Sequence, residues 1–289
     1  MRGAMDLVLT LLGPQIPAAR QALASAGLAV KAERKLGPDA LDLEIEGEPP
    51  KLDAILGGLL VDHCLQPMAG RRKRLLVADM DSTIIDVECL DELADFAGVK
   101  AQVSAITERA MAGELDFEAA LRERVAMLKG LPLAALERTY FERVKLNPGA
   151  RTLVRTMATG GARCVLVSGG FEFFTGRVAS AAGFHADRAN RLLDDGRNLS
   201  GQVAEPILGR EAKLFALREE ATALGVPLSA TLAVGDGAND LAMIEAAGLG
   251  VAYRAKPIVA ARADAKVDHA DLTALLYFQG YASEAFVTD

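Results

Sequence analysis

The sequence predicts an α/β protein whose main domain is a doubly wound, mostly parallel sheet. Four short apolar runs have the composition of buried parallel strands, at residues 75–78, 164–167, 231–234 and 249–253. Helical segments separate these runs, and this alternation is typical of a parallel sheet with helices on both faces. Polar residues follow three of the runs directly. Because ligands bind at the carboxyl ends of strands in open parallel sheets, we expect the functional site at that edge.

The composition argues against several classes of function. The 289-residue chain has a formal net charge of −7, which disfavours general nucleic-acid binding. The one dense basic run, residues 71–74, is interpreted as a solvated linker. No apolar run is long enough to span a membrane, and the first residues lack a signal-peptide pattern. Cys64, Cys89 and Cys164 have no CxxC spacing and are predicted to be buried, reduced thiols of a cytoplasmic protein.

A small α+β domain is predicted for residues 1–70. Its expected elements are a strand, a helix, two strands and a helix, at 5–12, 17–26, 28–34, 40–46 and 51–61. A final strand over 64–68 has only a weak pattern. This order packs helices on one face of a small sheet, and nothing in it looks catalytic.

Residues 71–289 form the predicted main domain, which contains a helical insertion at about 85–147. Several amphipathic helical patterns fill this insertion, with breakers at Gly98, Gly113, Gly130 and residues 147–149. Because the insertion follows the strand at 75–78 and its acidic end, we expect it to cover the cleft as a cap.

The remaining elements of the main domain follow in order. Helices are expected at 149–161, 172–182, 209–224, 241–247 and 255–263, and residues 272–279 are expected to close the fold. A small hairpin is predicted over 189–207, and residues 265–267 are expected to form a short edge segment. No GxGxxG follows the first strand of the domain, and no GxxxxGK[ST] occurs, so a dinucleotide-binding fold and a P-loop ATPase are poorly supported.

Carboxylates, a lysine and several hydrogen-bond donors are expected to meet at the strand ends. The candidates are Asp79, Asp81, Ser168, Gly169, Lys213, Asp236, Asn239 and Asp240. Packed carboxylates repel one another unless a cation joins them, and oxygen ligands beside a phosphate favour Mg²⁺. Hydroxyl, backbone N–H and lysine groups suit phosphate oxygens. The set therefore predicts Mg²⁺-dependent phosphoryl transfer with a carboxylate nucleophile, and the alternative is a group of turn and capping acids.

These motifs resemble those of the haloacid-dehalogenase-like phosphatases. The matching segments are DMDST at 79–83, SGG at 168–170, Lys213 and GDGAND at 235–240. Residues 110–132 with Glu88, SGGFEFF, ANRL and AKP resemble more narrowly the phosphoserine phosphatases within that group. The resemblance covers about residues 75–280 and implies a Rossmann-like haloacid-dehalogenase fold. The N-terminal strand and helix order is similar to that of ACT domains, which bind amino acids.

The resemblance implies a role for each catalytic candidate. Asp79 would be the nucleophile that forms an aspartyl-phosphate, and Asp81 would protonate the leaving oxygen and later activate water. Mg²⁺ would be held by the Asp79 side chain, the Asp81 backbone carbonyl and Asp236, with Asp240 supporting the metal site. The groups that would contact the phosphoryl oxygens are those of Ser168, Gly169, Lys213 and Asn239.

The implied substrate is O-phospho-L-serine, and the implied reaction releases L-serine and phosphate. Glu88 would meet the ammonium group, and Arg124 would grip the carboxylate bidentately, which a lysine cannot do. Met111 and Phe117 would pack over the substrate, although without the resemblance all four residues have ordinary structural interpretations.

Several alternatives stay open at this level. A related phosphatase or phosphotransferase could act on another amino-acid phosphate. A catalytically silent amino-acid sensor is a reading from a different class, which the intact Asp79, Asp81, Lys213 and Asp236 argue against. The N-terminal domain could bind an effector, support a homodimer, or only pack against the main domain.

Overall fold

Strand β5 (Leu75–Ala78), the first predicted strand of the main domain, lies inside a parallel sheet in the computed structural model, which describes residues 6–47 and 49–288. β5 pairs in parallel with β6 (Arg163–Phe171) on one side and β10 (Thr231–Gly235) on the other. β7 (Ala186–Asn190) extends the sheet beyond β6, and β11 (Leu249–Tyr253) and β12 (Ala265–Val267) extend it beyond β10. The predicted α/β fold with a mostly parallel sheet is confirmed.

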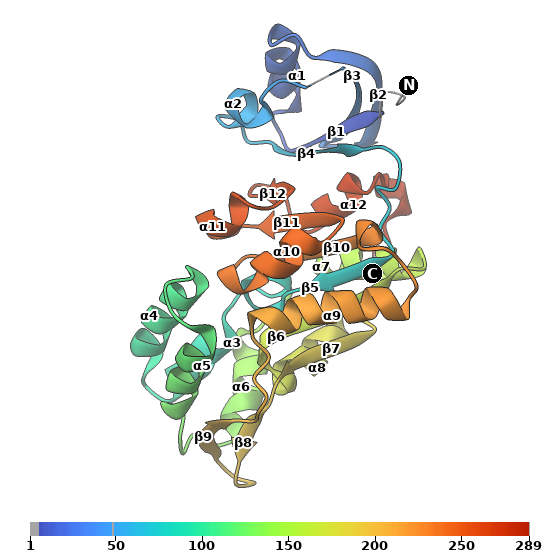
Figure 1. The fold of residues 1–289 in the computed structure, drawn as a ribbon. Coiled ribbons are helices and arrows are strands. Elements are labelled where there is room, and N and C mark those ends of the chain that lie inside the picture. The colour runs from blue at the N-terminus through green and yellow to red at the C-terminus, as the bar shows by residue number, and fades with distance from the viewer. Residues whose placement is uncertain (1–5, 48, 289) are drawn as a thin grey trace.

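Helices cover both faces of this sheet, and its central strands β5 and β10 are buried along their whole length. Leu75 and Val77 point into one core, and Leu76 and Ala78 point into the other, as alternating side chains of a strand must. The first core is closed by α9 (Arg210–Ala223), α10 (Leu241–Ala246) and α11 (Pro257–Ala260). The second is closed by α7 (Ala150–Thr159), α8 (Glu172–Ala182) and α12 (Ala274–Phe278). Figure 1 shows α9 and α10 on the near face.

The helical insertion is confirmed as four helices between β5 and α7. They are α3 (Cys89–Phe96), α4 (Lys100–Met111), α5 (Phe117–Ala126) and α6 (Ala134–Arg143). We call residues 85–147 the cap. Figure 1 shows these helices gathered beside one edge of the sheet, together with the hairpin of β8 (Leu192–Asp194) and β9 (Leu199–Val203).

The N-terminal segment forms four antiparallel strands in the order β2-β3-β1-β4. These strands are β1 (Leu7–Leu12), β2 (Ala29–Gly37), β3 (Ala40–Glu46) and β4 (Asp62–Pro67). Helices α1 (Ile16–Ser25) and α2 (Leu52–Leu56) contribute to the core on one face. The sequence pattern of the last strand is weak, but the strand is regular in the structure, since β4 pairs with all six residues of β1. The predicted start of the first strand, Met5, lies outside the described residues.

Other expectations were wrong in detail. The helix predicted over 51–61 has five residues and ends where Gly57 and Gly58 follow, and the helix predicted over 255–263 spans only Pro257–Ala260. Strand β7 was not predicted because its sequence ADRAN lacks an apolar run. β12 is not at an edge: Lys266 pairs with His63 of β4, so ten strands form one continuous sheet.

The basic run at 71–74 is not a freely solvated linker as expected. Arg71 forms an ion pair of 2.7 Å with the buried Asp42 of β3. Lys73 is buried, and its Nζ donates to the carbonyl oxygens of Ser229 and Gly248. The stems and charged heads of these residues therefore fasten the N-terminal sheet to the main domain.

A buried carboxylate strengthens the same junction. Asp62 at the start of β4 accepts hydrogen bonds from the backbone N–H groups of Asp268, His269 and Ala270, with the shortest at 2.7 Å. Such charge-assisted bonds hold the loop after β12 against the N-terminal sheet.

Among the described residues, no helix is both long and apolar enough to cross a membrane.

Candidate active site

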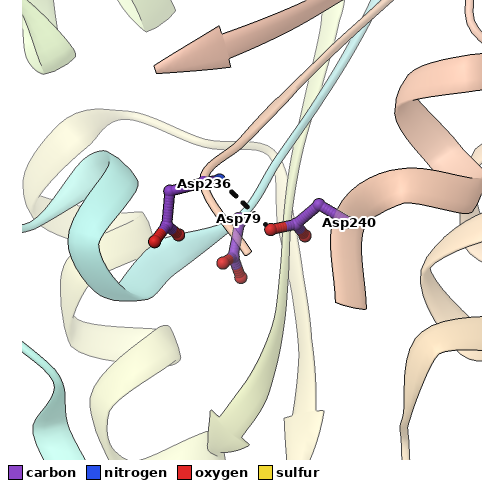
Figure 2. A group of neighbouring side chains, drawn as sticks. All are labelled: Asp79, Asp236 and Asp240. Carbon is purple, nitrogen blue, oxygen red and sulfur yellow. Dashed lines mark hydrogen bonds between the residues drawn. The ribbon is translucent and has the colours of Figure 1, made fainter. Parts of the chain in front are cut away.

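Three acidic side chains point toward one another where β5 and β10 end. Asp79 directly follows β5, while Asp236 and Asp240 belong to the loop after β10. Each offers a carboxylate oxygen, and these atoms all lie within 4.8 Å of one another (Figure 2). All three residues are buried, so water screens their repulsion poorly.

Lys213 is the cation that faces this group. It projects from α9, and its Nζ donates to Asp79 Oδ1 and to Asp240 Oδ1, both at 2.6 Å. Burial lowers the pKa of Lys213, but Asp240 and Asp79 outweigh that effect, so the pKa is raised and the ammonium stays charged. One positive charge thus opposes three carboxylates.

Burial and the excess of negative charge raise the pKa values of two of these acids. Burial, followed by repulsion from Asp240, raises the pKa of Asp79 well above its ordinary value. Burial, with repulsion from Glu88 and Asp79, does the same for the pKa of Asp236. Oxygen-only ligands with surplus charge fit a hard divalent cation, which would restore the balance. Asn239 lines the same pocket as Asp79, and its Oδ1 is buried without a hydrogen-bond partner among the described residues.

Two glycines let the loop after β10 fold onto its own acid. A Cβ on Gly235 would lie 2.4 Å from Asp240 Cγ, and one on Gly237 would lie 2.5 Å from Asn239 Oδ1. The close approach allows Asp240 Oδ2 to accept hydrogen bonds from the N–H groups of Asp236 and Gly237. A side chain at Gly235 would therefore displace Asp240, and one at Gly237 would displace Asn239 or Met111.

Asp81, the second acid of the DMDST motif, forms its hydrogen bonds outside the group of Asp79, Asp236 and Asp240. The turn after Asp79 places Ser82 at φ 54°, a left-handed conformation that is uncommon for a residue with a side chain. Asp81 Oδ1 accepts a hydrogen bond from the Cys89 N–H at 2.8 Å, and Oδ2 accepts one from Ser168 Oγ at 3.2 Å. Burial raises the pKa of Asp81, which suits a carboxyl that must carry a proton.

The cap closes over these groups and completes a pocket. Nine predicted site residues line it together: Asp79, Asp81, Glu88, Met111, Phe117, Arg124, Ser168, Gly169 and Asn239. Lys213, Asp236 and Asp240 do not line it and lie buried behind Asp79. A Cβ on Gly169 would lie 2.5 Å from Phe117 Cζ, so the glycine lets the cap aromatic approach the end of β6.

Two opposite charges enter the pocket from the cap. Burial and the charge of Asp81 raise the pKa of Glu88 to about 7, and Glu88 accepts a hydrogen bond of 2.6 Å from Ser82 Oγ. Arg124 lies on α5, and its Nη1 donates to Thr107 Oγ1 at 2.9 Å. Burial lowers the pKa of Arg124, yet a guanidinium remains charged near neutral pH.

Sequence reasoning missed some residues that shape this pocket. Asn190 at the end of β7 donates to the carbonyl oxygens of Gly169 and Leu208, and thereby holds the end of β6 against the segment before α9. Thr107 supports Arg124 in a similar way. Asn190 lies in the ANRL segment that carries part of the family resemblance, but its contact with the end of β6 is visible only in the structure. Thr107 belongs to no motif, so no local pattern indicates it. Leu90, Leu121, Gly170 and Phe171 also line the pocket.

The geometry agrees with a family assignment. Residues 76–245 match the model of the haloacid dehalogenase-like hydrolases. The chain belongs to this family.

Two relatives to which the chain is similar are phosphoserine phosphatases. A phosphoserine phosphatase of Archaeoglobus fulgidus is 43% identical over 217 residues, which cover 74% of this chain and 63% of that protein. A phosphoserine phosphatase of Polaromonas sp. is 42% identical over 224 residues, which cover 76% of this chain and 95% of the relative. This chain thus spans less than two thirds of the archaeal protein and nearly all of the Polaromonas one.

A solved structure has a similar fold. It is described as a phospho-aspartyl intermediate analogue of phosphoserine phosphatase, is 38% identical, and has a TM-score of 0.68. The similarity covers 72% of this chain and 99% of that one.

The acidic group predicts how the protein responds to Mg²⁺. A ligand that binds only the folded state raises its stability, so saturating Mg²⁺ should raise Tm by about 5 °C. Asp236→Asn should lose most of this rise. Without Mg²⁺ the variant should be at least as stable as the parent, because one buried charge is removed. Thermal unfolding with increasing Mg²⁺ measures both effects.

The matched control is Asp53→Asn, since Asp53 lies at the surface far from the strand ends. It should keep the full response to Mg²⁺. An Asp236→Asn protein that gains as much as the parent would contradict the assignment of the metal to Asp79, Asp236 and Asp240.

Proposed function

We propose that this protein hydrolyses O-phospho-L-serine to L-serine and phosphate through an aspartyl-phosphate on Asp79. The observation that carries the substrate assignment is the pair Glu88 and Arg124, which brings one negative and one positive side chain into the pocket that Asp79 lines. A zwitterionic amino acid with a phosphate presents the complementary charges. The similarity to phosphoserine phosphatases supports the same substrate.

The first step transfers the phosphoryl group to the protein. A carboxylate oxygen of Asp79 attacks phosphorus, and the bond from phosphorus to the serine oxygen breaks. Asp81 donates a proton to the departing oxygen, and L-serine leaves. The raised pKa of Asp81, caused by burial, favours the protonated form needed here.

The second step releases phosphate. Asp81 takes a proton from water as the water oxygen attacks phosphorus, and the bond from phosphorus to Asp79 breaks. Asp81 ends protonated, ready for the next cycle. Ser168 hydrogen-bonds to Asp81, and its hydroxyl oxygen accepts from the Gly170 N–H at 2.8 Å, so the proton-carrying group is held at the end of β6.

Charge balance explains the remaining groups. Mg²⁺, held by Asp79, Asp236 and the Asp81 backbone carbonyl with support from Asp240, would neutralise carboxylate and phosphoryl oxygens. Lys213 donates a hydrogen bond to Asp79 Oδ1, which orients the carboxylate and partly offsets the rise of its pKa. Ser168, Gly169 and Asn239 are proposed to contact the phosphoryl oxygens, while Met111 and Phe117 exclude water above them.

Three further expectations stay predictions. The ACT-like character of residues 1–70, with boundaries at 70 and at about 85–147 for the cap, rests on element order. A homodimer would place a symmetric contact on the N-terminal sheet. A cytoplasmic location agrees with Cys64, Cys89 and Cys164, which are all free and buried.

Matched analogues test the substrate assignment. 3-Phosphoglycerate has a hydroxyl in place of the ammonium group, and O-phosphoethanolamine lacks the carboxylate. The parent should prefer O-phospho-L-serine to both by at least about tenfold, since each ion pair in a closed pocket contributes over ~1.4 kcal/mol. Glu88→Gln should abolish the preference over 3-phosphoglycerate, and Arg124→Ala the preference over O-phosphoethanolamine. Steady-state kcat/KM for all three measures this.

Equal activity of the parent on all three substrates would overturn the substrate assignment while leaving the aspartyl-phosphate chemistry in place. No activity on any of them would favour an amino-acid sensor instead. A preference for phosphothreonine would favour the alternative of another amino-acid phosphate.

The raised pKa of Glu88 predicts a pH dependence. The groups that face it are Asp81, Asp91 and Arg124, with burial and Asp81 raising the pKa to about 7. Below that pH Glu88 becomes protonated and loses its attraction for an ammonium group. The preference for O-phospho-L-serine over 3-phosphoglycerate should therefore fall as pH drops from 8 to 6, as the ratio of kcat/KM values measures. In Glu88→Gln the ratio should be flat, and the same slope in both proteins would exclude Glu88 as the titrating group.

A further inference from the structure

Three helices of the cap each contribute one buried polar side chain to a chain of hydrogen bonds that ends at the pocket. Asp91 lies on α3, Thr107 on α4 and Arg124 on α5. The Thr107 hydroxyl donates to Asp91 Oδ1 at 2.6 Å and accepts a hydrogen bond from Arg124 Nη1 at 2.9 Å. The exposed fractions of the three residues are 8%, 4% and 3%. A buried carboxylate is thus linked, through one hydroxyl, to the guanidinium that lines the pocket.

A hydroxyl has one proton, and its direction decides what the oxygen can accept. Thr107 Oγ1 lies 2.6 Å from Asp91 and 3.1 Å from the Val103 carbonyl oxygen, so the charged Asp91 is the stronger acceptor. With the proton on that side, the lone pairs of the oxygen face Arg124. Asp91 therefore sets the orientation in which Thr107 receives the guanidinium.

This arrangement orients Arg124 without neutralising it. A carboxylate in direct contact would form a bidentate ion pair and compete with a carboxylate of the substrate. A neutral hydroxyl takes only one N–H. A second contact comes from Nε, which donates to the Ala120 carbonyl oxygen at 3.1 Å. Within the described part of the chain, these two bonds use two of the five N–H donors of Arg124 and leave the Nη2 edge for a ligand.

We propose that Thr107, oriented by Asp91, is the positioning residue that fixes Arg124 for the carboxylate of the substrate. The pair thereby sets the preference of the enzyme for phosphomonoesters that carry a carboxylate. This inference rests on the proposed function, because it assigns a cause to the substrate selectivity of the same site.

A purely structural role is the competing explanation, since the bond from Thr107 to Asp91 also ties α4 to α3. The cap supplies a matched control for it. Thr139 on α6 is likewise buried, and its hydroxyl donates to the Ala135 carbonyl oxygen of its own helix at 2.8 Å. Thr139→Val removes a buried cap hydroxyl without changing a contact of Arg124.

The test compares kcat and KM for O-phospho-L-serine and O-phosphoethanolamine. Thr107→Val keeps the shape of the side chain and removes the hydroxyl. It should lower the preference for O-phospho-L-serine about tenfold, mainly through KM, because one oriented hydrogen bond to a charged group is lost. Thr107→Ser, which keeps the hydroxyl, should retain the parental preference within about twofold. Thr107→Ala gives the same readout if valine is not accommodated.

A double variant separates the two explanations. In an Arg124→Ala background, Thr107→Val should change the preference no further, because the group that it positions is gone. A parent that prefers O-phospho-L-serine, with Thr107→Val and Thr139→Val both leaving that preference unchanged, would overturn the positioning role alone. A parent without the preference would overturn the proposed substrate, and the role of Thr107 with it.

Discussion

Three buried carboxylates lie close together, and two of them bond to a single lysine; this is the constraint on which the rest of the structure depends. Burial and mutual repulsion raise the pKa values of Asp79 and Asp236 well above their ordinary values, although Lys213 partly offsets the repulsion. A divalent cation would relieve this repulsion. The free-energy cost of assembling the acids in the folded protein would then be recovered when the cation binds.

The course of the backbone, rather than the packing of bulky side chains, brings the acids together. Strands β5 and β10 pair in parallel, and Ala78 at the end of β5 is the partner of Val234. Asp79 and Asp236 follow these strands closely, so both lie at the same edge of the sheet. Gly235 allows the loop to approach Asp240, Gly237 leaves room for Asn239, and α9 supplies Lys213. The cap then excludes water, which strengthens every charge interaction inside. In the proposed function, substrate choice is separate from this chemistry and is assigned to Glu88 and Arg124, which the cap contributes.

The parts of this site that follow a local rule could be predicted from the sequence. Buried parallel strands are apolar without interruption, so β5, β10 and β11 were evident, and acids directly after them indicated the edge where Asp79 and Asp236 lie. Side chains that act through a tertiary contact could not be predicted. Thr107 lies in an ordinary helical pattern, and Asn190 lies in the ANRL segment without any sign of its contact; only the packing of distant elements brings them to Arg124 and Gly169. Strand β12 looked like an edge because nothing local shows that β4 pairs with it.

The most direct test of the central claim is the identification of the phosphorylated residue. The protein would be mixed with O-phospho-L-serine and Mg²⁺, quenched in acid within milliseconds, and digested for mass spectrometry. The account predicts one added phosphoryl group on the peptide that contains Asp79, absent from Asp79→Asn. A full steady-state rate with no phosphoryl group on Asp79, or a rate in Asp79→Asn equal to that of the parent, would contradict it.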